Sequence, residues 1–144
     1  MNPITVDEAI LEVKRYGNLS NQKPVLVAVC GEPNAGKNHF CSRAMERFRQ
    51  MGSQARTTTA LNIYGLKGKM PDNLEYLFFD VTTDAPDKAI SDHVKRVIQL
   101  GMGRNPDVTV AMYGPKIPTY SQEELKELCD AFDFVVANSE ARRK

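Results

Sequence analysis

The sequence has 144 residues, the length of one ordinary domain, and its hydrophobic and charged fractions of 42% and 26% exclude wholesale disorder, a collagen-like chain and a disulfide scaffold. Its formal net charge is +1, from 19 basic and 18 acidic residues, so the chain as a whole exerts no long-range attraction on nucleic acids or anionic membranes. We therefore expect one domain over residues 1–144, and we interpret the basic end at residues 141–144 as a solvated tail.

The first expected element is a helix over residues 6–16. Thr5 and Glu8 have the spacing of a capping box at its start, and Gly17 is placed to end it. Apolar residues recur three to four positions apart and give this helix one apolar face. The polar residues 18–23 that follow are predicted to form a loop.

A strand buried on both faces is expected next, over residues 25–30. These residues are continuously apolar and rich in β-branched side chains, which is typical of a strand inside a parallel sheet. A turn that contains glycine follows, and then a helix over residues 37–51, with Gly52 as its stop.

The remaining elements continue the alternation of strands and helices. They are expected as a strand at 57–64, a core strand at 77–79 ending at Asp80, a helix at 87–100, a strand at 108–112, a helix at 121–131 and a strand at 134–137. This order predicts an α/β fold with a doubly wound, mainly parallel sheet of about five strands and helices on both faces.

The cysteines and the apolar runs favour a cytoplasmic protein. Cys30, Cys41 and Cys129 are odd in number and form no Cys-x-x-Cys pair, so nothing indicates an oxidising compartment. The first residues lack the pattern of a signal peptide, and no apolar run approaches the roughly 20 residues that span a bilayer.

The strongest motif is a phosphate-binding loop at residues 31–38, which fit Gly-x-x-x-x-Gly-Lys between a buried strand and a helix. The N–H groups of such a turn converge on phosphate oxygens, and the following helix points the positive end of its dipole at the anion. We therefore predict that ATP or another nucleoside triphosphate binds here. The residues predicted to hold it are Gly31, Glu32, Pro33, Asn34, Ala35, Gly36, Lys37, Asn38 and the adjacent His39.

Lys37 and Asp80 are the predicted catalytic residues. Lys37 would reach the β- and γ-phosphates, and Asp80, at the end of a core strand, would hold Mg²⁺ or its water. Asn38 is the second predicted metal contact, but it stands where the pattern has a Ser or Thr hydroxyl. This replacement weakens the case for turnover more than the case for binding.

Other polar residues near the motif have a structural and a functional interpretation. Asp84 is a candidate metal support or base, and helix capping after Pro86 is the competing role of Asp84 or Asp87. Neither His39 nor His93 belongs to a metal-binding cluster. The arginines are candidates for stabilising transferring phosphate, although most arginines are solvent-exposed: Arg43, Arg56 and Arg104. Arg104 is expected at the end of the sheet opposite the loop, where it would serve only a neighbouring subunit.

The sequence resembles the P-loop kinases, and within them the phage-type deoxynucleoside monophosphate kinases. The segments that carry the resemblance are residues 31–38, Asp80-Val81, residues 120–123 and residues 132–138. These kinases similarly close with an Asp, an apolar strand and an Asn, and they often have a carboxylate at the position of Asn38. The resemblance implies ATP, Mg²⁺ and a nucleotide acceptor. It differs at Thr82-Thr83, where the family would have an arginine, and this chain shows no arginine-rich lid.

Three hypotheses for function follow from these residues. The first is a kinase that moves the γ-phosphoryl group of ATP to a small acceptor, with a nucleotide favoured and the segment 57–72 as its acceptor site. The second is an oligomeric ATP hydrolase or translocase, favoured by the helix that precedes the first strand and by Arg104, which would act on a neighbouring subunit. The third is a nucleotide-binding module without catalysis, which the Asn38 substitution and the missing lid would favour.

Overall fold

The computed structural model describes residues 3–59, 73–114 and 120–138. Within these ranges the elements follow in the order α1 (Val6–Leu19), β1 (Val25–Gly31), α2 (Lys37–Gln50), β2 (Ala55–Thr59), β3 (Tyr76–Thr82), α4 (Lys88–Met102), β4 (Val108–Tyr113), α5 (Gln122–Ala131) and β5 (Phe134–Ala137). The five strands form one sheet in the order β2-β3-β1-β4-β5, and all four strand pairs are parallel. The predicted α/β fold is confirmed.

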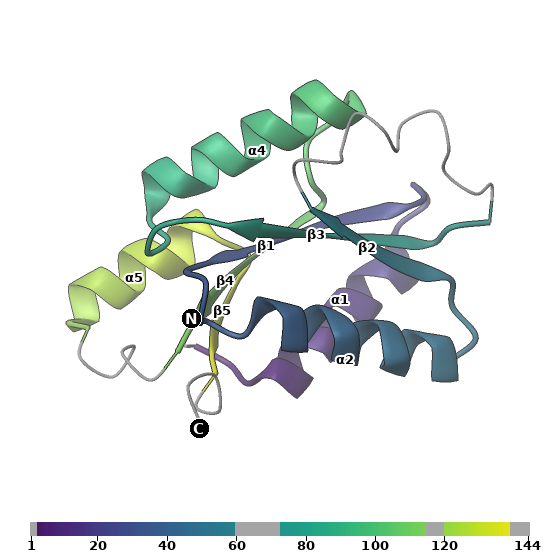
Figure 1. The fold of residues 1–144 in the computed structure, drawn as a ribbon, viewed down its shortest axis with the longest axis horizontal. Helices are drawn as coiled ribbons and strands as arrows, with labels where there is room; N and C mark the ends of the chain where they lie inside the picture. Colours follow the sequence, from purple (N-terminus) through teal and green to yellow (C-terminus); the bar gives the residue numbers. More distant parts are fainter. Residues whose placement is uncertain (1–2, 60–72, 115–119, 139–144) are drawn as a thin grey trace.

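Helices cover both faces of the sheet, as Figure 1 shows. Val25, Val27 and Val29 of β1 belong to the core formed with α1 and α2. The alternate residues Leu26 and Ala28 belong to the second core, formed with α4 and α5. Both sets are fully buried, which explains why β1 is apolar at every position rather than at every second one.

The predicted helix caps are confirmed at two helix starts, and one predicted helix end is wrong. Thr5 and Glu8 form the predicted capping box, and the Asp87 side chain caps α4 by accepting from the Ile90 N–H at 2.8 Å. The prediction that Gly17 ends the first helix was wrong, because α1 continues to Leu19. Gly17 is buried against Tyr76, and a Cβ there would lie 2.0 Å from the phenol oxygen, so the glycine permits close packing instead.

The bounds of β2 and β3 also differ from the predictions. The strand β2 begins at Ala55, and the part of the predicted strand at residues 60–64 lies outside the described residues. The strand β3 does not end at Asp80 but continues to Thr82. Its pairing with β1 continues to Gly31, the first residue of the predicted loop. Val29 lies opposite Asp80, and Gly31 lies opposite Thr82. The longer pairing places Asp80 two residues before the strand end, level with the base of the loop.

The helices that follow the neighbouring strands β1 and β3 pack on opposite faces of the sheet. After β1 the chain enters α2, which packs on one face of the sheet, and after β3 it enters α4, which packs on the other face. Neighbouring parallel strands whose connections diverge in this way leave a crevice at their carboxyl ends, where ligands bind in many open α/β sheets. The predicted phosphate-binding loop lies at this crevice.

Arg104 lies near the amino-terminal ends of β1 and β4, at the end of the sheet opposite the loop, as its place in the sequence predicted. It is not a solvated side chain, since it pairs with Asp107 at 2.7 Å and also donates to the Pro24 carbonyl. Asp107 in turn accepts from the Leu26 N–H at 2.8 Å, at the start of β1. Arg104 therefore fastens the amino-terminal ends of two strands together.

Replacing Asp107 by alanine should lower the free energy of unfolding by about 3 kcal/mol, because it leaves the Arg104 guanidinium and the Leu26 N–H without their shared carboxylate. Urea denaturation measures this loss. Asp92→Ala is the matched control, since Asp92 forms an exposed pair with Lys88 that is worth about 0.5 kcal/mol. Equal losses for the two variants would contradict the assignment of Asp107 as a structural clamp.

Candidate functional site

Two glycines shape the loop between β1 and α2, for different reasons. Gly31 is buried against β4, and a Cβ at this position would lie 2.7 Å from the Met112 carbonyl oxygen. Gly36 has φ 92° and ψ 22°, a left-handed conformation that residues with a Cβ rarely adopt. The first glycine therefore permits close packing, and the second permits the bend that directs the chain into α2.

The start of α2 is unlike the other described helix starts. Thr5, Asp87 and Ser121 each cap their helix with a side-chain oxygen, whereas the N-cap of α2 is Gly36 and no side chain accepts from its first turn. The first N–H groups of a helix have no partner within the helix. At α2 these donors remain for water or for an anion, and the helix dipole favours the anion.

Lys37 is the first residue of α2 and is 4% exposed. Its Nζ atom donates to the Glu32 carbonyl at 2.9 Å, which directs the ammonium group across the loop. Burial lowers the pKa of Lys37, while the nearby Asp80 carboxylate acts in the opposite direction. A positive charge is thus held at the loop with part of its hydration removed.

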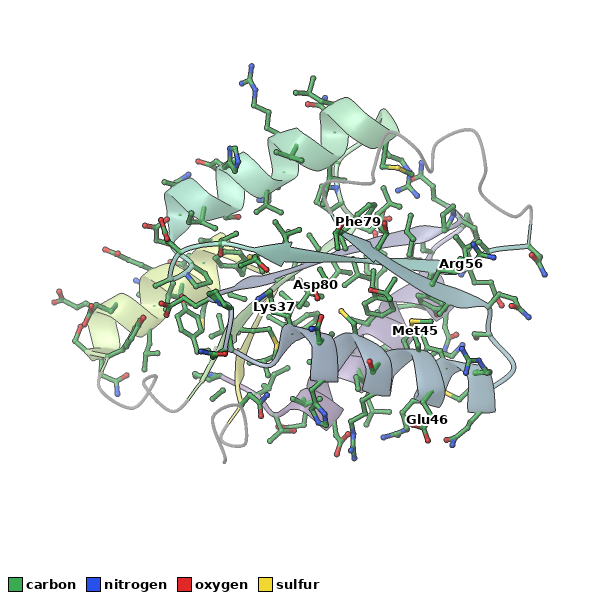
Figure 2. The ribbon with its side chains drawn as sticks, in the orientation of Figure 1. Lys37, Met45, Glu46, Arg56, Phe79 and Asp80 are labelled. Carbon is green, nitrogen blue, oxygen red and sulfur yellow. The ribbon has the colours of Figure 1, made fainter. Side chains whose placement is uncertain are left out.

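Asp80 projects from β3 beside the loop, and Figure 2 shows it near Lys37. Burial raises the pKa of this carboxyl group, while Lys37 acts to lower it. The two side chains interact electrostatically, but they do not form one of the ion pairs within 4.0 Å found among the described residues. Two opposite charges therefore face the same place without neutralising each other by direct contact.

An open hollow of about 320 Å³ lies over the loop and brings together most of the predicted residues. Its lining consists of Pro33, Asn34, Gly36, Lys37, Asn38, His39, Asp80 and Thr82. Of the other predicted residues, Gly31 and Ala35 are buried beneath the loop, and Glu32 contributes the carbonyl that Lys37 contacts. Thr82 was not predicted; only its pairing with Gly31 reveals its position.

Asn38 and Asp80, the two predicted metal contacts, line this hollow together. They offer an amide oxygen and a carboxylate oxygen, which suit a hard cation such as Mg²⁺. Among the described residues no three His, Cys, Asp or Glu side chains gather into a cluster that could hold a metal. The pair fits an ion that keeps several waters and shares the oxygens of a bound phosphate, as Mg²⁺ does.

A second hollow of about 580 Å³ adjoins the first and shares Asn38, Asp80 and Thr82 with it. The other described residues of its lining come from β2, β3 and α4: Thr59, Val81, His93, Val94, Val97 and Ile98. The sequence alone does not identify His93 as a site residue, because only the packing of α4 on the sheet places it beside this hollow. The rest of the predicted acceptor segment, residues 60–72, lies outside the described residues.

The other candidate residues lie away from the loop hollow or have structural partners. Arg43 pairs with Asp7 at 2.7 Å, at the start of α1, and Arg56 is exposed on β2. Asp84 is exposed, and Asp87, not Asp84, caps α4. Neither Arg43, Arg56 nor Asp84 lines the two hollows at the loop.

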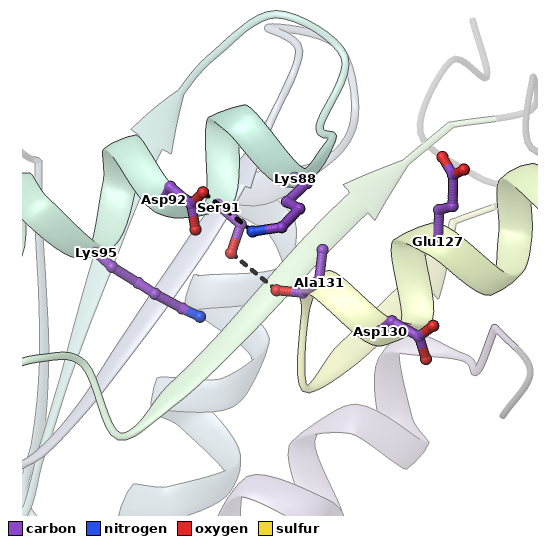
Figure 3. A pocket seen from close by; sticks show the side chains of 7 residues that line it. All are labelled: Lys88, Ser91, Asp92, Lys95, Glu127, Asp130 and Ala131. Atoms are coloured by element: carbon purple, nitrogen blue, oxygen red, sulfur yellow. Dashed lines mark hydrogen bonds and ion pairs between the residues drawn. The ribbon is translucent and has the colours of Figure 1, made fainter.

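A further hollow lies between α4 and α5 and shares no residue with the loop (Figure 3). The Ser91 hydroxyl donates to the Ala131 carbonyl across this seam at 2.8 Å, and Lys88 pairs with Asp92 on the surface of α4. Lys95 of α4 and the acidic Glu127 and Asp130 of α5 complete its charged lining. These contacts join two packed helices, and we assign no ligand to the seam.

Compared with models of known protein families and with curated proteins, the sequence has no match. The fold and the loop therefore define the protein as a parallel α/β protein with a five-stranded sheet, and any narrower class depends on the chemistry of the site. In the part of the chain that the structure describes, no helix has the length and apolar character required to cross a membrane.

The burial of Asp80 generates a prediction about stability. Asp80→Asn should raise the urea midpoint of the nucleotide-free protein at pH 7, because it removes a carboxylate whose charged form burial disfavours. The folded-state pKa of Asp80 lies above its ordinary value of 3.8, so the loss of stability is complete above the folded-state pKa and vanishes as the pH falls towards 3.8. The difference in urea midpoint between Asp80→Asn and the unmodified protein should therefore shrink as the pH falls from above the folded-state pKa towards 3.8.

Asp92→Asn controls for the loss of a negative charge, since Asp92 is exposed on α4. If Asp80→Asn were less stable than the unmodified protein at pH 7, the carboxylate would be a stabilising structural group and its assignment to a ligand site would lose its energetic support.

Proposed function

We propose that this protein binds a nucleoside triphosphate, with ATP as the favoured candidate, together with Mg²⁺, and transfers the γ-phosphoryl group to a small acceptor. The observation that carries the proposal is the placement of Lys37 and Asp80 on one hollow at the uncapped start of α2. A cation, a carboxylate and free helix N–H groups together suit a triphosphate with its metal. The resemblance to P-loop kinases supports the same chemistry.

Each residue has a role in this proposal that its position supports. The N–H groups at the start of α2 and the Lys37 ammonium would bind the phosphate oxygens, in a site where partial burial strengthens electrostatic interactions. Asp80 and Asn38 would hold Mg²⁺ directly or through water. The bound metal ion supplies positive charge that stabilises the charge developing on the transferred group.

The two competing hypotheses differ in what supports them. The oligomeric hydrolase was favoured by the helix before the first strand and by Arg104, but the Arg104 side chain is engaged by Asp107 and Pro24 at the far end of the sheet. A module that binds nucleotide without catalysis is supported by Asn38, which is exposed at the hollow and offers no hydroxyl. Release of ADP separates this module from a kinase, since both would bind ATP.

Saturating Mg²⁺-ATP should raise the melting temperature by roughly 5–10 °C, which corresponds to about 2.7 kcal/mol at a ligand concentration 100 times Kd. Lys37→Met should abolish this shift, because it keeps much of the buried stem and removes the charge. Differential scanning fluorimetry measures both, and Lys88→Met serves as a control because Lys88 is exposed on α4. An undiminished shift in Lys37→Met would mean that ATP binds elsewhere or without this ammonium group.

If Asp80 holds Mg²⁺, replacing it should remove the part of the thermal stabilisation by ATP that depends on Mg²⁺. With Asp80→Asn, ATP in the presence of EDTA should still raise the melting temperature, but the additional rise caused by Mg²⁺ should disappear. Asp84→Asn removes an exposed carboxylate from the same connection between β3 and α4 and should leave the Mg²⁺ increment intact. Equal increments in Asp80→Asn and the unmodified protein would exclude Asp80 as the carboxylate that holds the metal.

A further inference from the structure

The second hollow at the loop has a composition that bears on the acceptor. For brevity we call it the valine hollow, after Val81, Val94 and Val97 in its lining. It adjoins the hollow over the β1–α2 loop, called the phosphate hollow below, through Asn38, Asp80 and Thr82, so a molecule bound in it would lie beside the place proposed for the γ-phosphoryl group. Its volume of about 580 Å³ falls within the range of small-molecule sites.

The charge of this lining is unfavourable for a phosphate ester. Among the described residues of the valine hollow, the ionisable side chains are Asp80 and His93, and none is lysine or arginine. Thr82 occupies part of the lining near the position where the resembling kinases would supply an arginine. No lysine or arginine among these described lining residues would offset the charge of a phosphate ester, and the Mg²⁺ proposed at Asp80 would already be shared with the triphosphate.

The remaining lining combines one apolar wall with hydrogen-bonding groups. Val94 and Ile98 of α4 are buried, and Val97 and Val81 are partly exposed, so they form a surface against which a ring can pack. Thr59, Thr82 and His93 are exposed at the same hollow and can donate or accept hydrogen bonds. An apolar surface with a few polar groups is the usual composition of a site for an uncharged organic molecule.

We propose that the valine hollow binds the phosphoryl acceptor, and that this acceptor is an uncharged, hydroxyl-bearing ring compound of the nucleoside class rather than a nucleoside monophosphate. The inference rests on the proposed kinase function and narrows its substrate. The acceptor hydroxyl oxygen forms a bond to the γ-phosphorus, the bond from that phosphorus to the bridging oxygen breaks, and ADP leaves. The hydroxyl proton is released to solvent, so the products are a phosphate monoester and ADP.

Pairs of compounds that differ by a single phosphate group test this inference. ADP release is measured with Mg²⁺-ATP and each of the four deoxynucleosides, and again with each corresponding 5′-monophosphate at the same concentration. At least one deoxynucleoside should increase ADP release tenfold or more over the rate without acceptor, and its monophosphate should be at least tenfold less effective. A monophosphate that equals or exceeds its deoxynucleoside overturns the proposal, and so does a panel without any increase.

A variant that fills the hollow locates the acceptor. Val97→Trp should reduce the release of ADP with the best deoxynucleoside at least tenfold and leave the thermal shift by Mg²⁺-ATP unchanged, since Val97 does not line the phosphate hollow. Leu100→Trp adds the same side chain to the same helix at an exposed position outside the hollow and should have no effect. Unchanged acceptor-dependent release in Val97→Trp overturns the assignment of the valine hollow.

The thermal shift separates this inference from the function on which it rests. If Mg²⁺-ATP stabilises the protein and no deoxynucleoside increases ADP release, the nucleotide site stands and the acceptor class is wrong. If Mg²⁺-ATP produces no shift in the unmodified protein, the proposed function itself fails.

Discussion

The candidate site depends on one electrostatic arrangement, in which Lys37 and Asp80 face a common hollow without forming a direct ion pair. Burial disfavours the charged form of both side chains, since the pKa of Lys37 is lowered and that of Asp80 is raised. A fold gains no stability from keeping two such groups apart. Their separation is what a site needs if a phosphate is to meet the cation and a metal ion is to meet the carboxylate.

The sheet makes this separation possible. Lys37 begins the helix after β1, while Asp80 lies within β3, the strand that pairs with β1 along its whole length. Because α2 and α4 pack on opposite faces, the hollow between the two strand ends is not filled by either connection. At the other end of β1, Arg104 and Asp107 form a direct pair that fixes the strand starts. The ion pair of Arg104 and Asp107 at the amino-terminal ends of the strands thus stabilises the fold. The separated charges of Lys37 and Asp80 at the carboxyl ends face the candidate site.

The sequence was sufficient for the fold and for the position of the turn between β1 and α2, and less so for the residues that surround this turn. Continuous apolarity at residues 25–30 and the regular alternation of elements identified the parallel sheet, because burial on both faces leaves a strong local pattern. The role of Gly17 was predicted wrongly because this glycine permits a contact with Tyr76, which is 59 residues further along the chain and outside the reach of local sequence rules. Thr82 and His93 were missed at the site for the same reason: strand register and helix packing, rather than any motif, bring them to it.

The most direct test of the central claim is the response of backbone amide NMR signals to Mg²⁺-ATP. If the loop at β1–α2 holds the triphosphate, the largest changes in amide chemical shift should occur between residues 33 and 39, with a second group around Asp80 and Thr82. Changes centred on the seam between α4 and α5, or changes that leave residues 33–39 unaffected, would contradict the account.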